Sequence, residues 1–349
     1  MRIGFRVDAS VAIGSGHVMR CLTLAERLSG VGATCEFVMT EGPGDLIELV
    51  ADQHGHLVHR LPAAAAPLAT MAAATEAANP WRSEEEPLDW LVVDHYALAS
   101  AWELGMRGAA RRLMVIDDLA DRRHDCDLLL DQNLHENTTP YRDLVPADCV
   151  TLLGPRYALL RREFSDARFT TSREAGPVER LLITFGGSDP TNETVRALEQ
   201  LADAGAAGVQ HVDVVVGGAA ANLAAVTSLA ATLPSCRVHV QVSDIATLMS
   251  AADLCIGAGG STMWERCCLG LPTLMVAVAD HQVQFCRRLD HLGYARYIGN
   301  AAERPVEYLA ALRAALAEPE ILVAMAAKGM RLVDGQGADR VVKRMMETS

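Results

Sequence analysis

The sequence has no uninterrupted apolar run of about 18–20 residues, the length that a membrane-spanning helix needs. Its nine cysteines show no Cys-x-x-Cys spacing, which leaves a zinc or thioredoxin-like site without support and favours buried, reduced thiols. Basic residues are scarce as well, with 31 Lys and Arg against 44 Asp and Glu, a net charge of −13. Such a chain repels phosphate backbones, so we expect no nucleic acid partner. Because the long apolar run is missing, we also expect no integral membrane segment.

The length of the chain indicates two domains. Its 349 residues, 50% of them hydrophobic, exceed a single core, because one core stops growing near about 250–300 residues. Short aliphatic runs alternate with helix-length amphipathic stretches, which is typical of an α/β fold whose parallel sheets are covered on both faces. The expected strands are Ile3–Val7, Thr34–Met39, Leu91–Asp94, Leu113–Ile116, Leu128–Leu130, Thr151–Leu153, Leu181–Phe185, Val212–Val216, Val238–Val240, Leu254–Ile256 and Thr273–Val278.

A polar segment, Ser165–Val178, contains glycine and proline and precedes a new strand. It is the expected boundary between an N-terminal domain, 1–165, and a C-terminal domain, 166–349, whose last helix is free to pack back on the first domain. The residues up to Asp8 have no long apolar core, so they predict a first strand instead of a signal peptide and favour the cytoplasm. The Ala-rich segment Pro62–Pro80 stays open between a helix and a surface loop.

The first strand leads into a glycine-flanked loop, and a helix is expected to start near His17. Gly14 and Gly16 allow the backbone to approach a ligand closely. A helix N-terminus disfavours a protonated imidazole, so His17 is expected to be neutral and able to accept a proton, with simple capping as the alternative. A dinucleotide fingerprint is weaker, because Glu36 stands at a suitable distance but Met19 occupies the place of a third small residue.

Carboxylates follow the strands of the first half, at the edge where open α/β sheets bind ligands. Asp8, Asp94 and Asp117 are each able to orient His17 or a sugar hydroxyl, although capping of the next helix is favoured for Asp117. Tyr96 follows closely after Asp94 and has a hydroxyl suited to the rim of a substrate site. A partly buried structural tyrosine is the alternative.

The turn after the first strand of the second half contains Gly186, Gly187 and Ser188. Two adjacent glycines after a strand indicate space for a ligand, and a plain tight turn is the competing interpretation. Ser188, Asp189 and Thr191 are candidates for the N-cap of the following helix.

The most informative turn contains Gly260, Ser261 and Thr262 and lies at the expected start of a helix. Its backbone N–H groups and two hydroxyls are suited to cradle a diphosphate. No Lys follows, so the turn is not a Walker A motif. Glu265, one turn into the helix, is placed to accept hydrogen bonds from a ribose diol, and an acid that only stabilises the first helical turn is its alternative.

Together these segments resemble a known group of enzymes. The first half contains a strand, a Gly-x-Gly-His loop and a helix, and the second half contains Gly-Gly-Ser-Thr-x-x-Glu, a Gly-Leu-Pro turn and Gln282. These motifs resemble the two-domain GT-B architecture of the N-acetylglucosaminyltransferase that makes lipid II. From residue 1 to about 299 the chain is more closely similar to the UDP-sugar hydrolases of pseudaminic acid biosynthesis. The segments that carry this similarity are Arg6–Ser10, Ile13–Leu22, Val93–Tyr96 and Tyr157–Phe164.

The resemblance implies two Rossmann-like domains with parallel sheets facing across a cleft. It implies cleavage of UDP-2,4-diacetamido-2,4,6-trideoxy-β-L-altropyranose to UDP and the free sugar, with inversion and without metal or cofactor, in a pathway that serves flagellin glycosylation through a nonulosonic acid. It further implies that His17 is the base that activates water and that Tyr96 lies near the sugar. The family has an asparagine where this chain has His281, a departure that bears on the sugar side.

The chemistry of the residues agrees with such a reaction. UDP leaves as a stable anion, so the site needs donors for the diphosphate and one base, where ordinary glycosidases need two carboxylates. Arg161, between the two domains, is able to add a positive charge, with a surface salt bridge as its alternative. The expected catalytic residue is His17, and the expected substrate-binding residues are Asp8, Gly14, Gly16, Asp94, Tyr96, Arg161, Gly186, Gly187, Ser188, Gly260, Ser261, Thr262, Glu265, His281 and Gln282.

Other functions stay open at this point. A glycosyltransferase on the same scaffold would place an acceptor hydroxyl where the hydrolase holds water, and the fold by itself does not separate the two. An NAD-dependent dehydrogenase and a non-catalytic nucleotide-sugar-binding module are the remaining alternatives. A UDP-sugar and water are the expected partners.

Overall fold

A computed structural model describes residues 1–10, 13–63, 80–82, 86–173, 176–187, 189, 191–218, 220–233, 235–280 and 282–347. The chain divides into two compact units, which we describe separately. Unit 1 comprises Met1–Leu159 together with Gln336–Ser349, and unit 2 comprises Leu160–Gly335. Most of the segment Pro62–Pro80 lies outside the described residues, so its two interpretations stay open.

Unit 1 is built on a seven-stranded sheet in which every strand pair is parallel. The strand order is β3-β2-β1-β4-β5-β6-β7. Successive strands are added on one side of β1 up to β3 and on its other side from β4 onward, so the strand order reverses between β1 and β4. Ligands of open α/β sheets bind at the carboxyl ends of the strands at such a point. The strands are β1 (Arg2–Val7), β2 (Thr34–Thr40), β3 (Leu57–Leu61), β4 (Leu88–Asp94), β5 (Ala110–Ile116), β6 (Leu128–Asp131) and β7 (Val150–Leu153).

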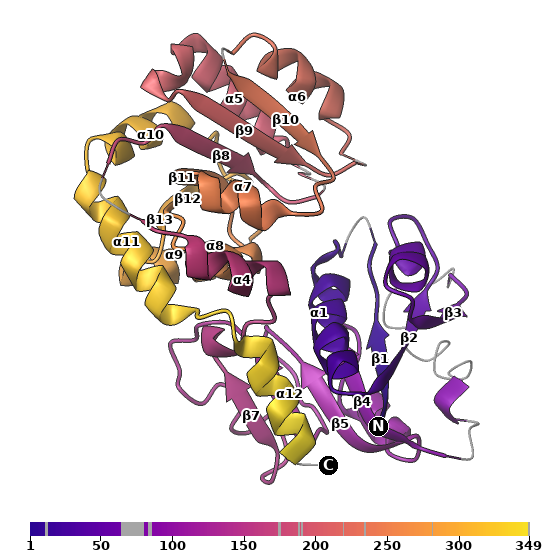
Figure 1. Cartoon of the computed structure of the whole chain (residues 1–349). Coiled ribbons are helices and arrows are strands. Elements are labelled where there is room, and N and C mark those ends of the chain that lie inside the picture. Colours follow the sequence, from indigo (N-terminus) through magenta and orange to yellow (C-terminus); the bar gives the residue numbers. More distant parts are fainter. Residues whose placement is uncertain are drawn as a thin grey trace. The chain divides into compact units, whose positions relative to one another are not determined.

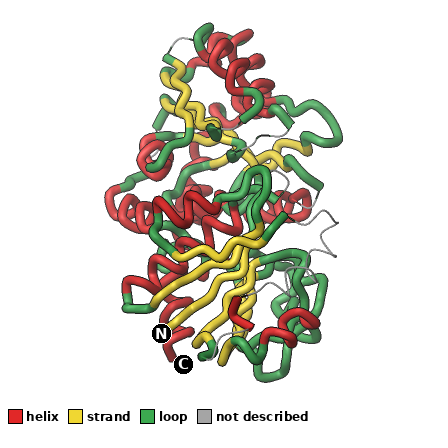
Figure 2. The backbone as a smooth tube through the Cα atoms, turned by 90° about the vertical axis from the view of Figure 1, so that its right-hand side faces the viewer, coloured by secondary structure: helices red, strands yellow, loops and turns green. Residues whose placement is uncertain are grey.

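Two hydrophobic clusters of unit 1 lie on the faces of this sheet. One contains Phe5, Phe37 and Trp90 with the apolar face of the first helix, and the other contains Trp81, Trp102 and Tyr141. Figure 2 shows helices flanking the strands. The helical elements of unit 1 are α1 (Gly16–Gly30), η1 (Leu49–Gln53), η2 (Pro80–Arg82), α3 (Ser100–Met106), η3 (Pro155–Tyr157) and α12 (Gly337–Glu347).

Unit 2 repeats the plan with a six-stranded parallel sheet of order β10-β9-β8-β11-β12-β13. Its reversal point lies between β8 and β11. The strands are β8 (Arg180–Thr184), β9 (His211–Val216), β10 (Cys236–Val240), β11 (Leu254–Ala258), β12 (Thr273–Ala277) and β13 (Arg296–Asn300). The helical elements are α4 (Arg162–Thr170), α5 (Glu193–Asp203), η4 (Gly205–Gly208), α6 (Leu223–Ala230), α7 (Ile245–Ala251), α8 (Thr262–Cys268), α9 (Gln282–Leu292), α10 (Tyr308–Leu316) and α11 (Pro319–Leu332).

The prediction of an α/β chain with two parallel sheets is confirmed, and all eleven expected strands occur. Two edge strands, β3 and β13, were not expected. Edge strands are half exposed, so their apolar runs are short and interrupted by polar residues. In β3 the residues His59 and Arg60 interrupt the run, and Leu57 is 60% exposed.

The division between the units falls at Leu159 and Leu160, slightly before the polar segment expected to form the boundary. Helix α4 packs against α7 and α8, which places it in unit 2. The chain then returns to unit 1 at its end, where α12 packs on α1 (Figure 1). Arg340 of α12 donates to the carbonyl of Arg156 at 2.8 Å.

No helix among the described residues combines the length and apolar character needed to cross a membrane.

The return of α12 generates a prediction about the stability of unit 1. Met345 is 0% exposed in the core around α1, so Met345→Ala is expected to lower the free energy of unfolding by about 2–5 kcal/mol, the usual cost of a core truncation. The neighbouring Met346 is 44% exposed, so Met346→Ala is the matched control and should change stability by at most about 0.5 kcal/mol. Urea unfolding of the three proteins measures both effects, and equal losses in the two variants would contradict the packing of α12.

Candidate functional site

Four buried aspartates lie in a row at the carboxyl edge of the unit 1 sheet. Asp8 follows β1, Asp94 ends β4, Asp117 follows β5 and Asp131 ends β6, and none is more than 5% exposed. These four strands are neighbours in the sheet, so the row spans its reversal point. A buried carboxylate is costly unless a cation or several donors compensate it, so the partners of each aspartate indicate its role.

Asp8 is committed to the framework of the sheet edge. Arg6 donates to its two carboxylate oxygens at 2.6 and 2.8 Å, and Thr40 donates a backbone N–H at 2.7 Å. His95 lies with Nε2 3.1 Å from the carboxylate and Nδ1 3.1 Å from the N–H of Ala97, which makes Nε2 the donor and Nδ1 the acceptor. Burial alone would raise the pKa of Asp8, but the charge of Arg6 and the bond from His95 hold it well below its usual range.

Asp94 joins His17 and Arg20. Its Oδ1 lies 2.6 Å from Nδ1 of His17, while Arg20 donates Nε to Oδ2 at 2.6 Å and Nη2 to Oδ1 at 2.7 Å. Burial alone would raise the pKa of Asp94, but Arg20 and then His17 hold it well below its usual range. Asp94 is therefore the aspartate that contacts His17, a choice that the sequence had left open among three candidates.

The partners of His17 define its tautomer. An ionised Asp94 only accepts hydrogen bonds, so Nδ1 of His17 carries the hydrogen and donates it. Nη2 of Arg20 lies 3.1 Å from the same Nδ1 but is itself a donor, so this approach is a contact and not a hydrogen bond. In the neutral form of the ring, Nε2 is then the nitrogen without a hydrogen, the arrangement that a general base needs.

Local backbone geometry places His17 at this edge. Gly14 has a φ of +82°, which favours glycine, and its N–H donates to the carbonyl of Ser10 at 2.8 Å. Helix α1 begins two residues later at Gly16, so His17 lies in its first turn. The positive φ at Gly14 and the start of the helix at Gly16 give these two glycines a structural role.

Tyr96 and Asp118 complete the surroundings of His17. The ring of Tyr96 meets the imidazole edge to face, with ring centres 4.6 Å apart and planes at 89°. Its hydroxyl donates to Asp118 at 3.3 Å, and Arg20 donates to the same oxygen at 3.1 Å. Tyr96 is 42% exposed, and partial burial together with Asp118 raises the pKa of its phenol well above the usual value. Its hydroxyl stays protonated and able to donate.

The other two aspartates of the row are structural. Asp117 accepts the N–H of Ala120 at 2.9 Å and pairs with Arg122 at 2.9 Å. The expected helix cap is wrong, because a loop without a helix joins β5 to β6 and Asp117 holds this loop instead. The hydroxyl of Tyr141 lies 2.8 Å from both Asp117 and Asp131. This buried network lies beside the His17 cluster without contributing a hydrogen bond to His17.

In unit 2 the turn after β8 contains Asp189, whose carboxylate caps the next helix. Asp189 accepts the backbone N–H groups of Glu193 and Thr194, both at 2.9 Å, so the start of α5 is already capped. Gly186 has a φ of +87°, and a Cβ on Gly217 would lie 2.0 Å from the carbonyl oxygen of Gly187. Gly186 and Gly187 are exposed, and a Cβ on either would meet no atom within 4 Å, so the ligand and tight-turn interpretations both stay open, while Ser188 lies outside the described residues.

The turn between β11 and α8 has a different character. Gly260 and Thr262 are partly exposed and Ser261 is exposed, so their polar groups face solvent. Gln282 lies close by, because a Cβ on Gly260 would be 3.9 Å from its Nε2, and its Oε1 accepts the N–H of Val278 at 3.0 Å. The structure thus brings Gly260, Ser261, Thr262 and Gln282 together, and His281 lies outside the described residues.

Glu265 is the acidic group of this turn. Arg161 lies 3.9 Å from its carboxylate and forms a shorter ion pair with Glu163, at 2.9 Å. Burial raises the pKa of Glu265 to about 7, against a smaller opposing effect of Arg161. The expected cation Arg161 is therefore engaged by two glutamates of unit 2.

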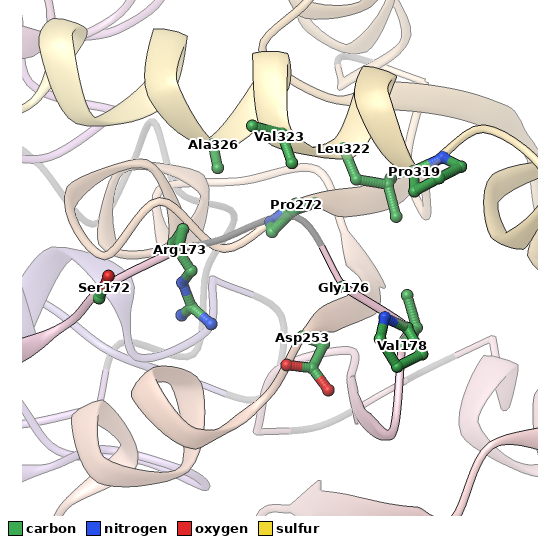
Figure 3. Close-up of a pocket in the computed structure, with 11 residues that line it drawn as sticks. Ser172, Arg173, Gly176, Val178, Asp253, Pro272, Pro319, Leu322, Val323 and Ala326 are labelled. Atoms are coloured by element: carbon green, nitrogen blue, oxygen red, sulfur yellow. The ribbon is translucent and has the colours of Figure 1, made fainter.

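A cavity in unit 2 lies apart from these motifs. It is lined on one side by α11 and on the other by Arg173, Asp253 and Pro272 (Figure 3).

 The Nε of Arg173 donates to the carbonyl of Leu269 at 3.0 Å and its Nη2 to that of Met249 at 2.7 Å. The polar groups of Asp253 are likewise occupied, because it accepts the N–H groups of Glu179 and Arg180. The cavity walls are thus structural.

Three residues near these motifs were missed by the sequence analysis: Arg20, Asp118 and Arg266. Arg20 had a usable signal, because it stands three residues after His17 and so shares its face of α1. Arg266 is 0% exposed and follows Glu265 directly, yet nothing in the local pattern indicates that its side chain turns back toward the start of α8. Among the described residues, no group of three His, Cys, Asp or Glu side chains is arranged to hold a metal ion.

Comparison with solved structures defines the class of fold. The chain matches MurG of Acinetobacter baumannii with a TM-score of 0.65 at 16% identity, covering 99% of both chains. It matches the UDP-GlcNAc 2-epimerase of Neisseria meningitidis with a TM-score of 0.67 at 11% identity, covering 99% of this chain and all of that one. The predicted GT-B type fold, with two Rossmann-like units, is confirmed.

Sequence comparison narrows the relationship. Residues 181–341 match the glycosyltransferase family 28 C-terminal domain. The UDP-2,4-diacetamido-2,4,6-trideoxy-beta-L-altropyranose hydrolase of Campylobacter jejuni is 24% identical over 301 residues, which cover 84% of this chain and 98% of that protein. The resemblance inferred from the motifs is therefore confirmed over most of the chain.

The raised pKa of Glu265 generates a prediction about stability and pH. A carboxyl whose pKa is about 7 in the folded protein, above its usual value, holds its proton more tightly when folded, so stability falls as the pH rises toward 7. Glu265→Gln removes this loss, and its melting temperature should rise relative to wild type between pH 5 and pH 8, by about 2–4 °C for each kcal/mol in a domain of this size. The exposed Glu199→Gln is the control. A Glu265→Gln effect that is the same at every pH would contradict the assignment.

Proposed function

We propose that this protein hydrolyses a UDP-linked 2,4-diacetamido-2,4,6-trideoxy sugar at its anomeric carbon and releases UDP and the free sugar with inversion, as a step of pseudaminic acid biosynthesis. The observation that carries the proposal is the His17–Asp94 pair, in which Nδ1 faces the carboxylate and Nε2 would be the proton acceptor of a neutral imidazole. The similarity to the Campylobacter jejuni hydrolase, which covers 98% of that protein, supports the substrate class.

In this proposal His17 acts as the general base. Its Nε2 takes a proton from water while the water oxygen bonds to the anomeric carbon, and the bond from that carbon to the diphosphate oxygen breaks. The bonding electrons leave with UDP. Asp94 keeps the ring in the required tautomer and stabilises the imidazolium that forms, as in other carboxylate–histidine pairs. Attack opposite the leaving group inverts the anomeric configuration.

We assign the nucleotide to unit 2. The diphosphate would accept hydrogen bonds from backbone N–H groups and hydroxyls at Gly260, Ser261 and Thr262, which are accessible in the turn before α8. The ionised form of Glu265 would accept hydrogen bonds from the ribose diol. The match of residues 181–341 to a glycosyltransferase C-terminal domain supports a nucleotide-sugar site in this unit.

The sugar side is assigned to unit 1. Tyr96 is 42% exposed and contacts His17 through its ring, and its hydroxyl, which donates to Asp118, is able to accept the N–H of an acetamido group. His281 remains a proposed sugar contact at the position where the hydrolase family has asparagine. Asp8 is a weaker candidate than the sequence indicated, because Arg6, Thr40 and His95 already occupy its carboxylate.

A glycosyltransferase is the second candidate, and the family 28 C-terminal domain favours it. The two reactions differ in the nucleophile, which is water in one and a hydroxyl of an acceptor in the other. Both would use the same nucleotide site and the same base.

The role of His17 is tested by His17→Ala. Removal of the base is expected to lower the rate of UDP release from the UDP-sugar by about 10²–10⁴-fold, the usual contribution of a positioned general base. UDP should still bind, since the nucleotide is assigned to unit 2. Single-turnover kinetics and calorimetry with UDP measure the two properties.

The matched control for this variant is His54→Asn. His54 also pairs with a carboxylate of unit 1, Glu26 at 2.9 Å, but lies near the other end of α1. It should keep the wild-type rate. Turnover that survives in His17→Ala would remove the assignment of the base.

The choice between hydrolysis and transfer is tested in ¹⁸O-labelled water. The protein is incubated with UDP-2,4-diacetamido-2,4,6-trideoxy-β-L-altropyranose and no acceptor, and the products are analysed by mass spectrometry. Hydrolysis at the anomeric carbon predicts free sugar that carries the label and UDP that does not. Label in UDP would indicate cleavage at phosphorus, and absence of UDP release without an added acceptor would favour the glycosyltransferase.

A further inference from the structure

Arg266 carries a fully buried guanidinium into the turn between β11 and α8. Nη2 donates to the carbonyl of Ala258 at 2.5 Å and to the hydroxyl of Thr262 at 3.1 Å. Nε donates to the carbonyl of Thr262 at 3.3 Å. One charged group thus bonds the last residue of the strand and the first residue of the helix, so it holds both ends of the turn.

Among the described residues, the partners of the Arg266 guanidinium are the carbonyls of Ala258 and Thr262, the hydroxyl of Thr262 and the sulfur of Cys255, and none of them is a carboxylate. Its sequence neighbour Glu265 interacts with it only at longer range, and burial raises the pKa of Glu265 to about 7, so that glutamate is only partly ionised at neutral pH. A buried cation without a counter-ion is unfavourable by several kcal/mol, which indicates that something else balances it.

Two other arginines of unit 2, both only partly buried, show how a guanidinium charge is balanced elsewhere. Arg168 donates to the carbonyls of Cys268 and Met330, at 2.6 and 2.7 Å, near the ends of α8 and α11. Arg173 donates to carbonyls at the ends of α7 and α8. Helix C-termini carry partial negative charge, which compensates both cations. Arg266 instead reaches the first turn of α8, the end with partial positive charge, so the helix adds to its charge.

The packing beneath the turn is built around this guanidinium. A Cβ on Gly257 would lie 2.9 Å from Nη1 of Arg266 and 2.5 Å from the carbonyl oxygen of Thr184. Only glycine leaves that space, so the strand residue next to Ala258 accommodates the arginine. The packing of Gly257 therefore fixes the position of the Arg266 charge. Gly260 and Ser261, in the same turn, are accessible to solvent.

We propose that Arg266 is a positioning residue for the diphosphate of a bound nucleotide, which supplies the missing negative charge while Arg266 holds the turn from Ala258 to Thr262. The inference rests on the proposed function, which assigns the diphosphate to this turn. Arg266 acts through the turn and through its field, without direct contact. Affinity for UDP should then depend on Arg266, whereas affinity for uridine, which has no phosphate, should not.

The test compares UDP and uridine binding to wild type and Arg266→Met by calorimetry. The variant is expected to bind UDP about 10–100-fold more weakly, because it loses the hydrogen bonds from a charged group that hold the turn, with uridine affinity unchanged. Arg168→Met is the matched control, because it removes a partly buried arginine of α4 that bonds the opposite end of α8, and it should keep the wild-type ratio of the two affinities. A ratio that is unchanged in Arg266→Met overturns the proposal.

Arg266→Lys provides a second variant, with thermal unfolding as the check that each protein is folded. Lysine keeps the charge but cannot bond Ala258 and Thr262 in the same fork, so UDP affinity should fall about 3–10-fold, less than in Arg266→Met. Equal losses for UDP and uridine would indicate a merely structural role and would also overturn the proposal. Failure of the wild type to bind UDP would instead contradict the proposed function, so the two failures are distinguishable.

Discussion

The candidate site in unit 1 depends on the ion pair between Asp94 and Arg20. Asp94 is 1% exposed at the end of a central strand, where an unpaired carboxylate would be strongly unfavourable. Arg20 bonds both of its oxygens and keeps it ionised, and one of those oxygens is still able to accept Nδ1–H of His17. The interaction that makes the sheet edge stable is thus the one that sets the tautomer of the proposed base. Asp94 therefore has a structural role, through Arg20, and a proposed catalytic role, through His17.

The two units share the reversal in strand order, but the charges that gather at the reversal point are opposite in sign. In unit 1 the reversal point between β1 and β4 gathers aspartates, each compensated by basic partners. In unit 2 the corresponding point between β8 and β11 gathers glycines, hydroxyls and a buried arginine. In the turn before α5, Asp189 already accepts two backbone N–H groups of the helix, and the turn before α8 contains the exposed Ser261. The proposed proton acceptor in one unit and the proposed anion site in the other would suit a reaction that activates water and expels a diphosphate.

Most of the fold could be predicted because parallel sheets impose continuous apolar runs on their central strands. The edge strand β3 escaped, since His59 and Arg60 face an environment that tolerates charge, as did β13 at the edge of the other sheet. The boundary near Leu160 and the return of α12 depend on which unit a helix packs against. The amphipathic pattern of α12 indicates a buried face without indicating its partner.

The amino-acid order alone led to two parallel sheets, to His17 at a helix start and to the glycine turn before Glu265, because each is a local pattern of a few neighbouring residues. Folding decided which aspartate meets His17, since Asp94 lies 77 positions away and a hydrogen bond depends on tenths of an ångström. It likewise turned Asp8 toward Arg6, closed the α5 turn with Asp189 and buried Arg266 behind the α8 turn. Such choices depend on distances between chain segments, which no local spacing specifies.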